Sequence, residues 1–411
     1  MSVKTKVLII GAGHAAGALA AQLREQGFQG DITLVGDEPW LPYQRPPLSK
    51  AFIKGEPDPQ TLYLKNAAWY ADQGVVVRTG ESAIAIERGA GRVMLASGER
   101  LPYDYLVLAT GARPRQLAVP GAQLAGILTL RGIDDAARLK AALRPGRRLA
   151  IVGGGYIGLE VAASARALGV EVTVIEREER LLARVASASL SQFFEGLHQR
   201  NGVQLIRNAC LSHFEGSGSV QAALLADGSK VECDAALIGI GAQPRDELAR
   251  ESGLTCENGV VVDHEARSSD PAIFAIGDLS FRPLPTYGDS MFRLESVPNA
   301  LEQARQVACA ITGKSAPTPE VPWFWSDQYD CKLQIAGLPF GATRQVMRGS
   351  PEQGKFAVYH LCGERVVAVE AVASPLDFIA GKQFIASAAA VSAERLADSA
   401  VKAKDAVLLA A

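Results

Sequence analysis

The pattern of hydrophobic and polar residues occurs twice along the chain. Residues 7–27 (VLIIGAGHAAGALAAQLREQG) and residues 149–169 (LAIVGGGYIGLEVAASARALG) each read as an apolar run of strand length, a glycine turn and a helical stretch. A second apolar run follows each copy, DITLVGD in the first and VEVTVIER in the second. Strand, helix and strand in this order predict a β-α-β unit, and this chain contains two such units.

A second pair of similar segments closes each unit. YDYLVLATGARP (103–114) matches CDAALIGIGAQP (233–244), and both read as a strand that runs into a Gly-Ala-x-Pro turn. The segment 84–104 alternates apolar and polar residues between glycine breaks, which predicts a small antiparallel meander before the last strand of the first unit. AIFAIGD (272–278) predicts a further strand that ends in an acid.

The pattern changes after residue 311. The stretch TGKSAPTPEVP (312–322) is rich in Pro, Ser and Thr and is typical of a linker. Beyond it, KFAVYHLCGERVVAVEAV (355–372) alternates as antiparallel strands do, and an Ala-rich helix or frayed tail ends the chain. This third module has no glycine loop for phosphate, so we do not expect it to be a catalytic unit by itself.

Composition excludes several classes of function. Of 411 residues, 48% are hydrophobic and 21% charged, and the net charge of −2 gives no overall basic field for nucleic acid. No uninterrupted apolar stretch is long enough to span a membrane. The six cysteines are scattered without a CxxC or CxxxxC spacing, and the five histidines form no HExxH. We therefore expect no metal, no disulfide scaffold and a cytoplasmic location.

Both glycine turns follow the G-x-G-x-x-[G/A] pattern of dinucleotide-binding loops. The first glycine allows a tight turn, the second lets the backbone approach a pyrophosphate, and the third position packs the helix on the strand. The helix N-terminus then offers free N–H groups to the phosphates. A single match is weak, but two matches in the same β-α-β context predict two dinucleotides on one chain.

Acids at the ends of the second strands distinguish the two sites. Glu176 lies 23 residues after Gly153 and can bind both ribose hydroxyls of an adenosine, which favours NADH over NADPH. Arg177 and Arg180 follow closely and could still tolerate a 2′-phosphate. In the first unit Asp37 comes one position later than the aligned residue.

With these motifs, the chain resembles FAD-dependent pyridine-nucleotide reductases, specifically the ferredoxin reductases of bacterial cytochrome monooxygenase and aromatic-ring dioxygenase systems. The resemblance covers essentially the whole chain and rests on GAGHAAG, RPPLSK, LATGARP, GGGYIGLEVAA, AIGD, ESVPNALEQA and PWFWSDQY. It implies an α/β fold with two Rossmann-like dinucleotide-binding domains of the three-layer ββα type and an α+β C-terminal domain. The implied boundaries are 1–112 with 243–317 for FAD, 113–242 for NAD, and 318–411 for the C-terminal domain.

The resemblance also implies which residues bind each cofactor. Those expected at FAD are Gly11, Gly13, His14, Ala15, Ala16, Asp37, Arg45, Lys50, Thr110, Gly111, Gly277, Asp278, Val297 and Trp325. Those expected at NADH are Gly153, Gly155, Tyr156, Ile157, Gly158, Glu160, Glu176 and Gly241.

Four of these residues are expected to act in the reaction. Lys50 is implied near flavin N5, and Glu160 and Tyr156 are implied near the nicotinamide, with Glu160 able to pair with Lys50. Trp325 is implied at the flavin edge that faces the electron acceptor, whereas Trp323 is as readily a packing anchor.

Further roles concern binding of the flavin. Arg45 is implied beside the flavin ring and Asp278 at the ribityl chain. The Val297 backbone is implied at the pyrimidine edge, toward which the following helix directs its positive end.

The chain lacks the cysteines through which some relatives pass electrons on. Thiol-dependent relatives carry one or two cysteines near the flavin, but no cysteine precedes residue 210 here, which excludes a thiol relay at PPLSK. The resemblance then implies a cycle in which NADH gives hydride to FAD and single electrons pass to a 2Fe–2S ferredoxin. Such ferredoxins are acidic, so Arg305, Lys332 and Lys382 are candidate docking residues.

Other readings stay open at this point. A rubredoxin reductase or an NADH oxidase acting on oxygen shares the same fold. A flavoprotein like apoptosis-inducing factor would need a targeting leader, a long insertion and a basic surface, none of which is evident here.

Overall fold

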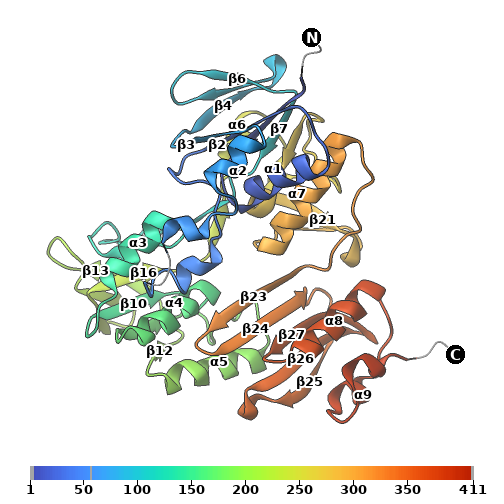
Figure 1. Cartoon of the computed structure of the whole chain (residues 1–411). Coiled ribbons are helices and arrows are strands. Elements are labelled where there is room, and N and C mark those ends of the chain that lie inside the picture. Colours follow the sequence, from blue (N-terminus) through green and yellow to red (C-terminus); the bar gives the residue numbers. More distant parts are fainter. Residues whose placement is uncertain (1–3, 56–57, 409–411) are drawn as a thin grey trace. The chain divides into compact units, whose positions relative to one another are not determined.

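The fold is taken from a computed structural model, which describes residues 4–55 and 58–408. The chain divides into two compact units (Figure 1). The first comprises Met1–Gln44, Pro59–Arg113 and Gln243–Pro322, and the second comprises Arg45–Asp58, Pro114–Ala242 and Trp323–Ala411. The RPPLSK segment therefore belongs to the second unit, together with the second glycine loop.

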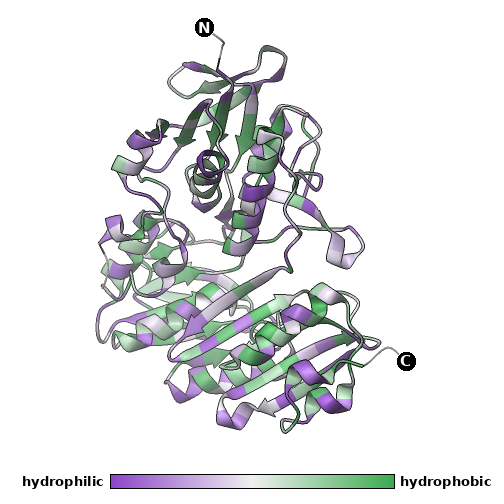
Figure 2. Ribbon diagram, turned by 45° about the vertical axis from the view of Figure 1, so that its right-hand side comes forward, coloured by the Kyte–Doolittle hydropathy of each residue, from purple (hydrophilic) through white to green (hydrophobic). Residues whose placement is uncertain are grey.

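The first unit is built on a five-stranded parallel sheet with the order β20-β7-β1-β2-β3. Its strands are β1 (Lys6–Ile10), β2 (Asp31–Gly36), β3 (Val75–Thr79), β7 (Tyr105–Leu108) and β20 (Ile273–Ala275). The central strands are apolar at nearly every position because both faces of the sheet are covered. Figure 2 shows these strands as largely hydrophobic.

Neighbouring residues of β1 reach two separate cores. Ile9 packs in a cluster with helices α1 (His14–Glu25) and α7 (Val297–Thr312), which lie side by side (Figure 1). Leu8 packs in a second cluster with the antiparallel strands β4 (Ala83–Glu87), β5 (Arg92–Leu95) and β6 (Arg100–Pro102). The layers are therefore meander, parallel sheet and helices, which confirms both the predicted meander and the ββα arrangement.

Smaller elements complete this unit. A four-stranded sheet has the order β18-β19-β21-β22, with strands Cys256–Glu257, Gly259–Val261, Ser280–Leu284 and Ser290–Phe292. Two short helices are α2 (Ala67–Asp72) and α6 (Glu247–Glu251). The predicted linker contains no helix or strand between residues 313 and 322.

The second unit repeats this plan. Its parallel sheet has the order β12-β11-β10-β16-β9. The strands are β9 (Ile127–Leu128), β10 (Arg148–Val152), β11 (Glu171–Ile175), β12 (Gln204–Ile206) and β16 (Ala235–Ile238), and the helices are α3 (Ile133–Ala142), α4 (Tyr156–Ala167) and α5 (Ala188–Arg200). A second meander of β13 (Leu211–Glu215), β14 (Ala222–Leu225) and β15 (Lys230–Glu232) shares a core with this sheet.

The C-terminal part of this unit is an antiparallel sheet with the order β23-β24-β27-β26-β25. Its strands are β23 (Trp323–Gln328), β24 (Cys331–Gly337), β25 (Arg344–Ser350), β26 (Lys355–Cys362) and β27 (Arg365–Val372). Helix α8 (Pro375–Ser387) packs on the sheet, and α9 (Ala393–Ala397) follows. The predicted antiparallel strands are confirmed. The Ala-rich C-terminal segment is helical only in part, in α9 and in a 3-10 helix, η7 (Ala403–Ala406), and its last residues, 409–411, lie outside the described residues.

Candidate functional site

The second glycine loop leaves space where a pyrophosphate would approach. Gly153 has φ +107°, and a Cβ on it would lie 2.5 Å from the Gly239 oxygen. A Cβ on Gly158 would lie 2.6 Å from the Gly153 oxygen, so this position serves close packing of helix on strand. A Cβ on Gly155 would meet nothing within 4 Å. Packing within the protein therefore does not explain the glycine at position 155, whereas close approach of a phosphate to the backbone would explain it.

The first glycine loop has the same backbone geometry. Gly11 has φ +110°, and a Cβ on it would lie 2.2 Å from the Ala109 oxygen. Helix α1 begins at His14, and its N-cap residue Gly13 provides no side-chain hydrogen bond. Ala15 and Ala16 follow as buried residues. Helices α1 and α4 thus lack a side-chain cap, unlike α5 and α7, whose first turns are capped by serine hydroxyls.

The acid at the end of β11 is held against the second glycine loop. Glu176 accepts hydrogen bonds from the Gly154 N–H (2.6 Å) and the Glu178 N–H (2.9 Å). Arg180 donates to the carbonyl oxygens of Ala183 and Ala186, and to a serine hydroxyl in α5. Its guanidinium is thus used within the protein, while the exposed Arg177 pairs with Glu178.

Arg245, which the sequence did not single out, joins three residues expected near FAD. Its side chain forms an ion pair with Asp37 (2.8 Å), its carbonyl oxygen accepts from the Thr110 hydroxyl (2.8 Å), and its N–H donates to the Gly111 oxygen (2.9 Å). These contacts hold the end of β2 and the turn after β7 together. In the other unit, Gly241 lies in the turn after β16 with φ +99°.

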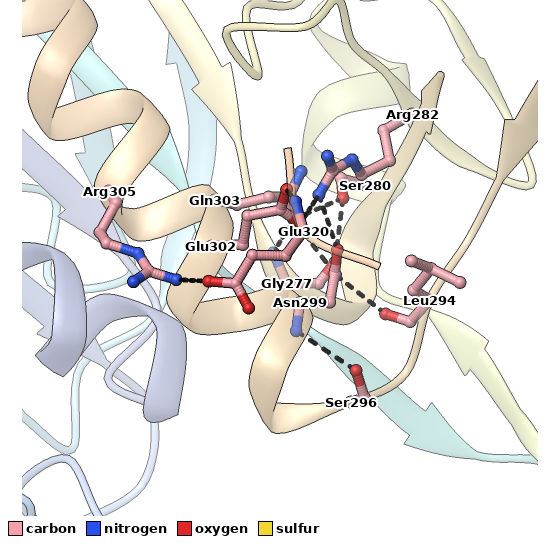
Figure 3. Close-up of polar contacts among 10 residues, drawn as sticks. All are labelled: Gly277, Ser280, Arg282, Leu294, Ser296, Asn299, Glu302, Gln303, Arg305 and Glu320. Carbon is pink, nitrogen blue, oxygen red and sulfur yellow. Dashed lines mark hydrogen bonds and ion pairs between the residues drawn. The ribbon is translucent and has the colours of Figure 1, made fainter. Parts of the chain in front are cut away.

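The AIGD turn and the start of α7 are joined by one buried glutamine. Gln303 Oε1 accepts from the Gly277 N–H (2.8 Å), the Ser280 hydroxyl (2.9 Å) and Asn299 Nδ2 (3.3 Å) (Figure 3). This places the turn that carries Asp278 next to α7, which begins at Val297. The sequence motifs AIGD and ESVPNALEQA therefore form one structural feature.

A buried ion pair lies beside this glutamine. Arg282 Nη1 lies 2.8 Å from Glu302 Oε2, with the two side chains only 4% and 6% exposed, and it also donates to Asn299 Oδ1 (3.1 Å). Glu302 Oε1 accepts from the Glu320 N–H (2.9 Å), and Glu320 in turn pairs with Arg305 (Figure 3). The predicted docking residue Arg305 is thus partly exposed and already ion-paired.

The RPPLSK segment forms a short 3-10 helix, η1 (Pro46–Ser49), directly before Lys50. Lys50 Nζ lies 2.7 Å from Glu160 Oε2, and the Ser49 hydroxyl donates to the same oxygen (2.5 Å). Lys50 also donates to the Pro46 oxygen (3.2 Å). The structure therefore brings Lys50 and Glu160 together, with Glu160 6% exposed on α4. Arg45, just before η1, donates to the Arg131 oxygen (2.7 Å).

One face of β23 lies against α4. The Ser326 hydroxyl donates to Glu160 Oε1 (2.7 Å), so the Glu160 carboxylate accepts three hydrogen bonds in all. Phe324 stacks edge-on against Tyr156, the first residue of α4, with ring centroids 4.9 Å apart. Burial raises the pKa of the Tyr156 hydroxyl far above its usual range. The next residue of α4, Ile157, is exposed.

On the other face of β23, Trp323 contacts helix α8. Trp323 and Trp325 have ring centroids 5.6 Å apart, and Trp323 also contacts Phe378 of α8 (5.6 Å). Lys382 Nζ lies 5.4 Å from the centroid of the Trp323 ring. Trp323 thus has the packing role considered from the sequence. Lys332, the third docking candidate, is exposed on β24.

The cysteines and the possible metal ligands among the described residues bear on the expectations from sequence. All six cysteines are free. Burial raises the pKa of Cys233 to about 11 and of Cys331 to about 12, so these two are neutral thiols near pH 7. Within residues 4–55 and 58–408 no group of His, Cys, Asp and Glu has the arrangement of a metal site. Among the same residues, no helix has the length and hydrophobicity needed to cross a bilayer.

Comparisons with known proteins extend over the whole chain. The family model described as pyridine nucleotide-disulphide oxidoreductase matches residues 5–304, and the reductase C-terminal model matches residues 323–407. The probable ferredoxin reductase CtmF of Castellaniella defragrans is 50% identical over 403 residues, covering 98% of each chain. Putidaredoxin reductase CamA of Pseudomonas putida is 40% identical over 416 residues, covering 100% of this chain and 98% of its own.

Solved structures give the same result. The reductase in the covalent putidaredoxin reductase–putidaredoxin complex superposes with a TM-score of 0.95 at 40% identity, covering 98% of this chain and 97% of that one. The ferredoxin reductase for the CYP199A2 system from Rhodopseudomonas palustris gives 0.94 at 38% identity, covering 98% and 100%.

Proposed function

The chain belongs to the pyridine nucleotide-disulphide oxidoreductase family, and from this premise we propose that it is an NADH-dependent FAD flavoprotein that reduces a 2Fe–2S ferredoxin. The observation that carries the proposal is the end-to-end match with ferredoxin reductases, C-terminal module included. Bound flavin supplies chemistry that amino acids lack, since it accepts a hydride from NADH and releases electrons singly. The ferredoxin would in turn feed an oxygenase.

The first unit has the features that an FAD site needs. The uncapped start of α1 and the tight turn at Gly11 suit a pyrophosphate, and Asp278 is held next to α7 by Gln303. We assign residues 1–112 and 243–317 to FAD, 113–242 to NADH, and 318–411 to the C-terminal domain. Within the FAD site, Asp278 and the Val297 backbone are proposed as direct contacts.

For the nicotinamide dinucleotide, Glu176 supports NADH as the substrate. Its carboxylate lies at the second glycine loop and would repel a 2′-phosphate. Arg180 does not compensate, because its donors are used by backbone carbonyl oxygens and a serine hydroxyl. Use of NADH also supports a cytoplasmic location, where this substrate is available.

In the reaction itself, we assign Lys50 the role of a positive charge that favours the arrival of a hydride. The Lys50 ammonium is held by Glu160 and by the Pro46 oxygen, so its position is fixed before NADH binds. Tyr156 is the first residue of α4, directly after the second glycine loop, and Glu160 lies one turn further along the helix. Their proposed role is to orient the nicotinamide, and Trp325 is proposed at the side from which electrons leave.

The preferred electron acceptor distinguishes this proposal from a rubredoxin reductase and from an NADH oxidase. The FAD-loaded protein should be assayed with NADH and, in parallel, a 2Fe–2S ferredoxin, a rubredoxin and oxygen, following absorbance of the flavin and of each acceptor. We expect fast reduction of the ferredoxin and slow reaction with oxygen. Efficient turnover with oxygen alone, or with rubredoxin in preference to ferredoxin, would refute the proposed acceptor.

A further inference from the structure

A chain of hydrogen bonds continues from Glu160 into the interior of the second unit. The Ser326 hydroxyl donates to Glu160 Oε1 (2.7 Å), and Gln328 Nε2 donates to Ser326 Oγ (3.2 Å). Gln328 Oε1 lies 2.8 Å from His198 Nε2, and the Tyr329 hydroxyl lies 3.3 Å from His198 Nδ1. The SDQY half of the PWFWSDQY motif, which the proposed function does not use, supplies three of these four residues.

The side chains that form this series of hydrogen bonds are closed to solvent. Gln328 and His198 are 0% exposed and Ser326 is 1% exposed. Ser326 and Gln328 share a face of β23 because side chains alternate along a strand, and His198 comes from α5. Since buried polar groups left unpaired are costly, each of these groups depends on its neighbour in the chain.

The direction of every hydrogen bond follows from the carboxylate. Glu160 paired with Lys50 can only accept, so Ser326 gives its single proton to Glu160 and must accept from the Gln328 amide N–H. The amide then presents its oxygen to His198, which assigns the histidine proton to Nε2 and makes Nδ1 the acceptor for Tyr329. Burial lowers the pKa of His198, in agreement with a neutral ring.

We propose that Ser326, Gln328 and His198 are positioning residues that fix the Glu160 carboxylate, and through it Lys50, for the hydride-accepting half of the reaction. This inference rests on the proposed function. A carboxylate on a helix can rotate about three side-chain bonds, and donors from Ser49, Lys50 and Ser326 together hold both of its oxygens. Gln328 and His198 in turn hold the Ser326 hydroxyl in its donating orientation.

A proton relay is the other role such a chain suggests, and the chemistry of Gln328 argues against it. An amide passes a proton only through its imidic acid form, whereas it holds a donor and an acceptor in place without changing its bonds. This series of hydrogen bonds is therefore better suited to holding the Glu160 carboxylate in a fixed orientation than to transferring a proton.

A double-mutant cycle tests whether Ser326 acts through Glu160. In single-turnover reactions of the FAD-loaded protein with NADH, we expect Ser326→Ala to slow flavin reduction about tenfold, because rate falls steeply when a reacting group is misplaced. In a Glu160→Gln background the same change should have less than about a twofold effect, since the carboxylate that it positions is gone. Gln328→Met should behave like Ser326→Ala, and Ser326→Thr, which keeps the hydroxyl, should restore most of the rate.

A second measurement does not depend on turnover. Acylation of Lys50 by acetic anhydride, followed by mass spectrometry of the FAD-loaded protein, reports how firmly the ammonium is held. We expect Ser326→Ala to raise the Lys50 rate by about threefold or more, approaching that of Glu160→Gln. The matched control is Ser374→Ala, which removes another buried serine hydroxyl that donates to a carboxylate, that of Asp377 (2.5 Å). This control should leave both readouts unchanged.

The possible results separate the explanations. Equal effects of Ser326→Ala in the two backgrounds, or effects matched by Ser374→Ala, would show a purely structural role and overturn the inference. A solvent deuterium effect on flavin reduction that disappears in Gln328→Met would favour a relay and also overturn it. Failure of the proposed function is distinct, because the unaltered protein would then not reduce its flavin with NADH, while the acylation measurement would still report on Lys50.

Discussion

Breaking the buried ion pair beside the AIGD turn should destabilise the first unit far more than its surface ion pairs would suggest. Arg282 and Glu302 are almost fully enclosed, and Arg282 also donates to Asn299 Oδ1 (Figure 3). The change Glu302→Gln keeps the shape of the side chain but leaves the guanidinium without a counter-charge. Arg282→Met is the reciprocal change.

The magnitude follows from burial. Removing one partner of a buried pair typically costs about 3–5 kcal/mol, since the remaining charge keeps its desolvation penalty without compensation. Replacing both, in Arg282→Met/Glu302→Met, removes both penalties and leaves two neutral groups unpaired, the Glu320 N–H and Asn299 Oδ1, at about 1–3 kcal/mol each. Because Arg282→Met also leaves Asn299 Oδ1 unpaired and keeps the uncompensated charge of Glu302, the double variant should be more stable than Arg282→Met.

Urea unfolding of the FAD-loaded protein at fixed protein and FAD concentrations provides the assay, with release of flavin fluorescence as the probe. The matched control is Arg113→Met, which breaks the pair with Glu247 (2.5 Å), where the side chains are 45% and 47% exposed. That change should cost no more than about 1 kcal/mol. A double variant that is less stable than Arg282→Met would refute the reasoning, as would a Glu302→Gln variant indistinguishable from the control.

Further predictions concern the cofactor, the acceptor, the thiols and pH. Glu176→Gln should raise the KM for NADH and increase the NADPH/NADH ratio of kcat/KM about tenfold, since like charge no longer opposes the 2′-phosphate; an unchanged ratio would contradict the assignment. Lys382→Glu, or its combination with Arg305→Glu, should slow ferredoxin reduction at low salt while sparing ferricyanide turnover with NADH, and equal loss in both assays would argue against docking there. Serine in place of the exposed thiols Cys210 and Cys362 should leave NADH–ferredoxin turnover unchanged, whereas a thiol relay predicts its loss. Burial lowers the pKa of His198 below the ordinary 6.5, so below about pH 6.5 the unfolded chain binds a proton that the folded chain does not. Urea titrations should therefore show that the free energy of unfolding falls as the pH drops below about 6.5, and His198→Gln should flatten this dependence.

The repeated glycine units were readable from sequence because their signal is local. Gly11 and Gly153 each follow an apolar strand directly, and the positive φ of both residues is a property of the turn itself. The first meander was equally visible through its alternation. The second meander was not recognised, because Gly-Ser breaks and short strands interrupt its pattern, although it lies at the corresponding place in the repeat.

The contacts that complete the site join residues far apart in the sequence, so local sequence patterns do not predict them. Only the family resemblance predicts the pairing of Lys50 with Glu160. Ser326 and His198 carry no motif of their own, and they meet because a strand and a helix far apart in sequence pack together. Arg245 likewise has no local signal, because its sequence context is that of a surface arginine and its contacts with Asp37 and Thr110 arise only in the folded unit.

The alternation along β23 has a consequence for redesign. Trp323 contacts α8 and Trp325 packs beside Trp323 on the same face, whereas the side chains at positions 324, 326 and 328 contact α4 and α5. A library that varies only the odd-numbered positions could alter the tryptophan face while every hydrogen bond of the even-numbered positions is kept. Inserting or deleting one residue would instead exchange the two faces. Substitutions at odd-numbered and at even-numbered positions of this strand therefore affect different faces. Variants must keep the length of the strand.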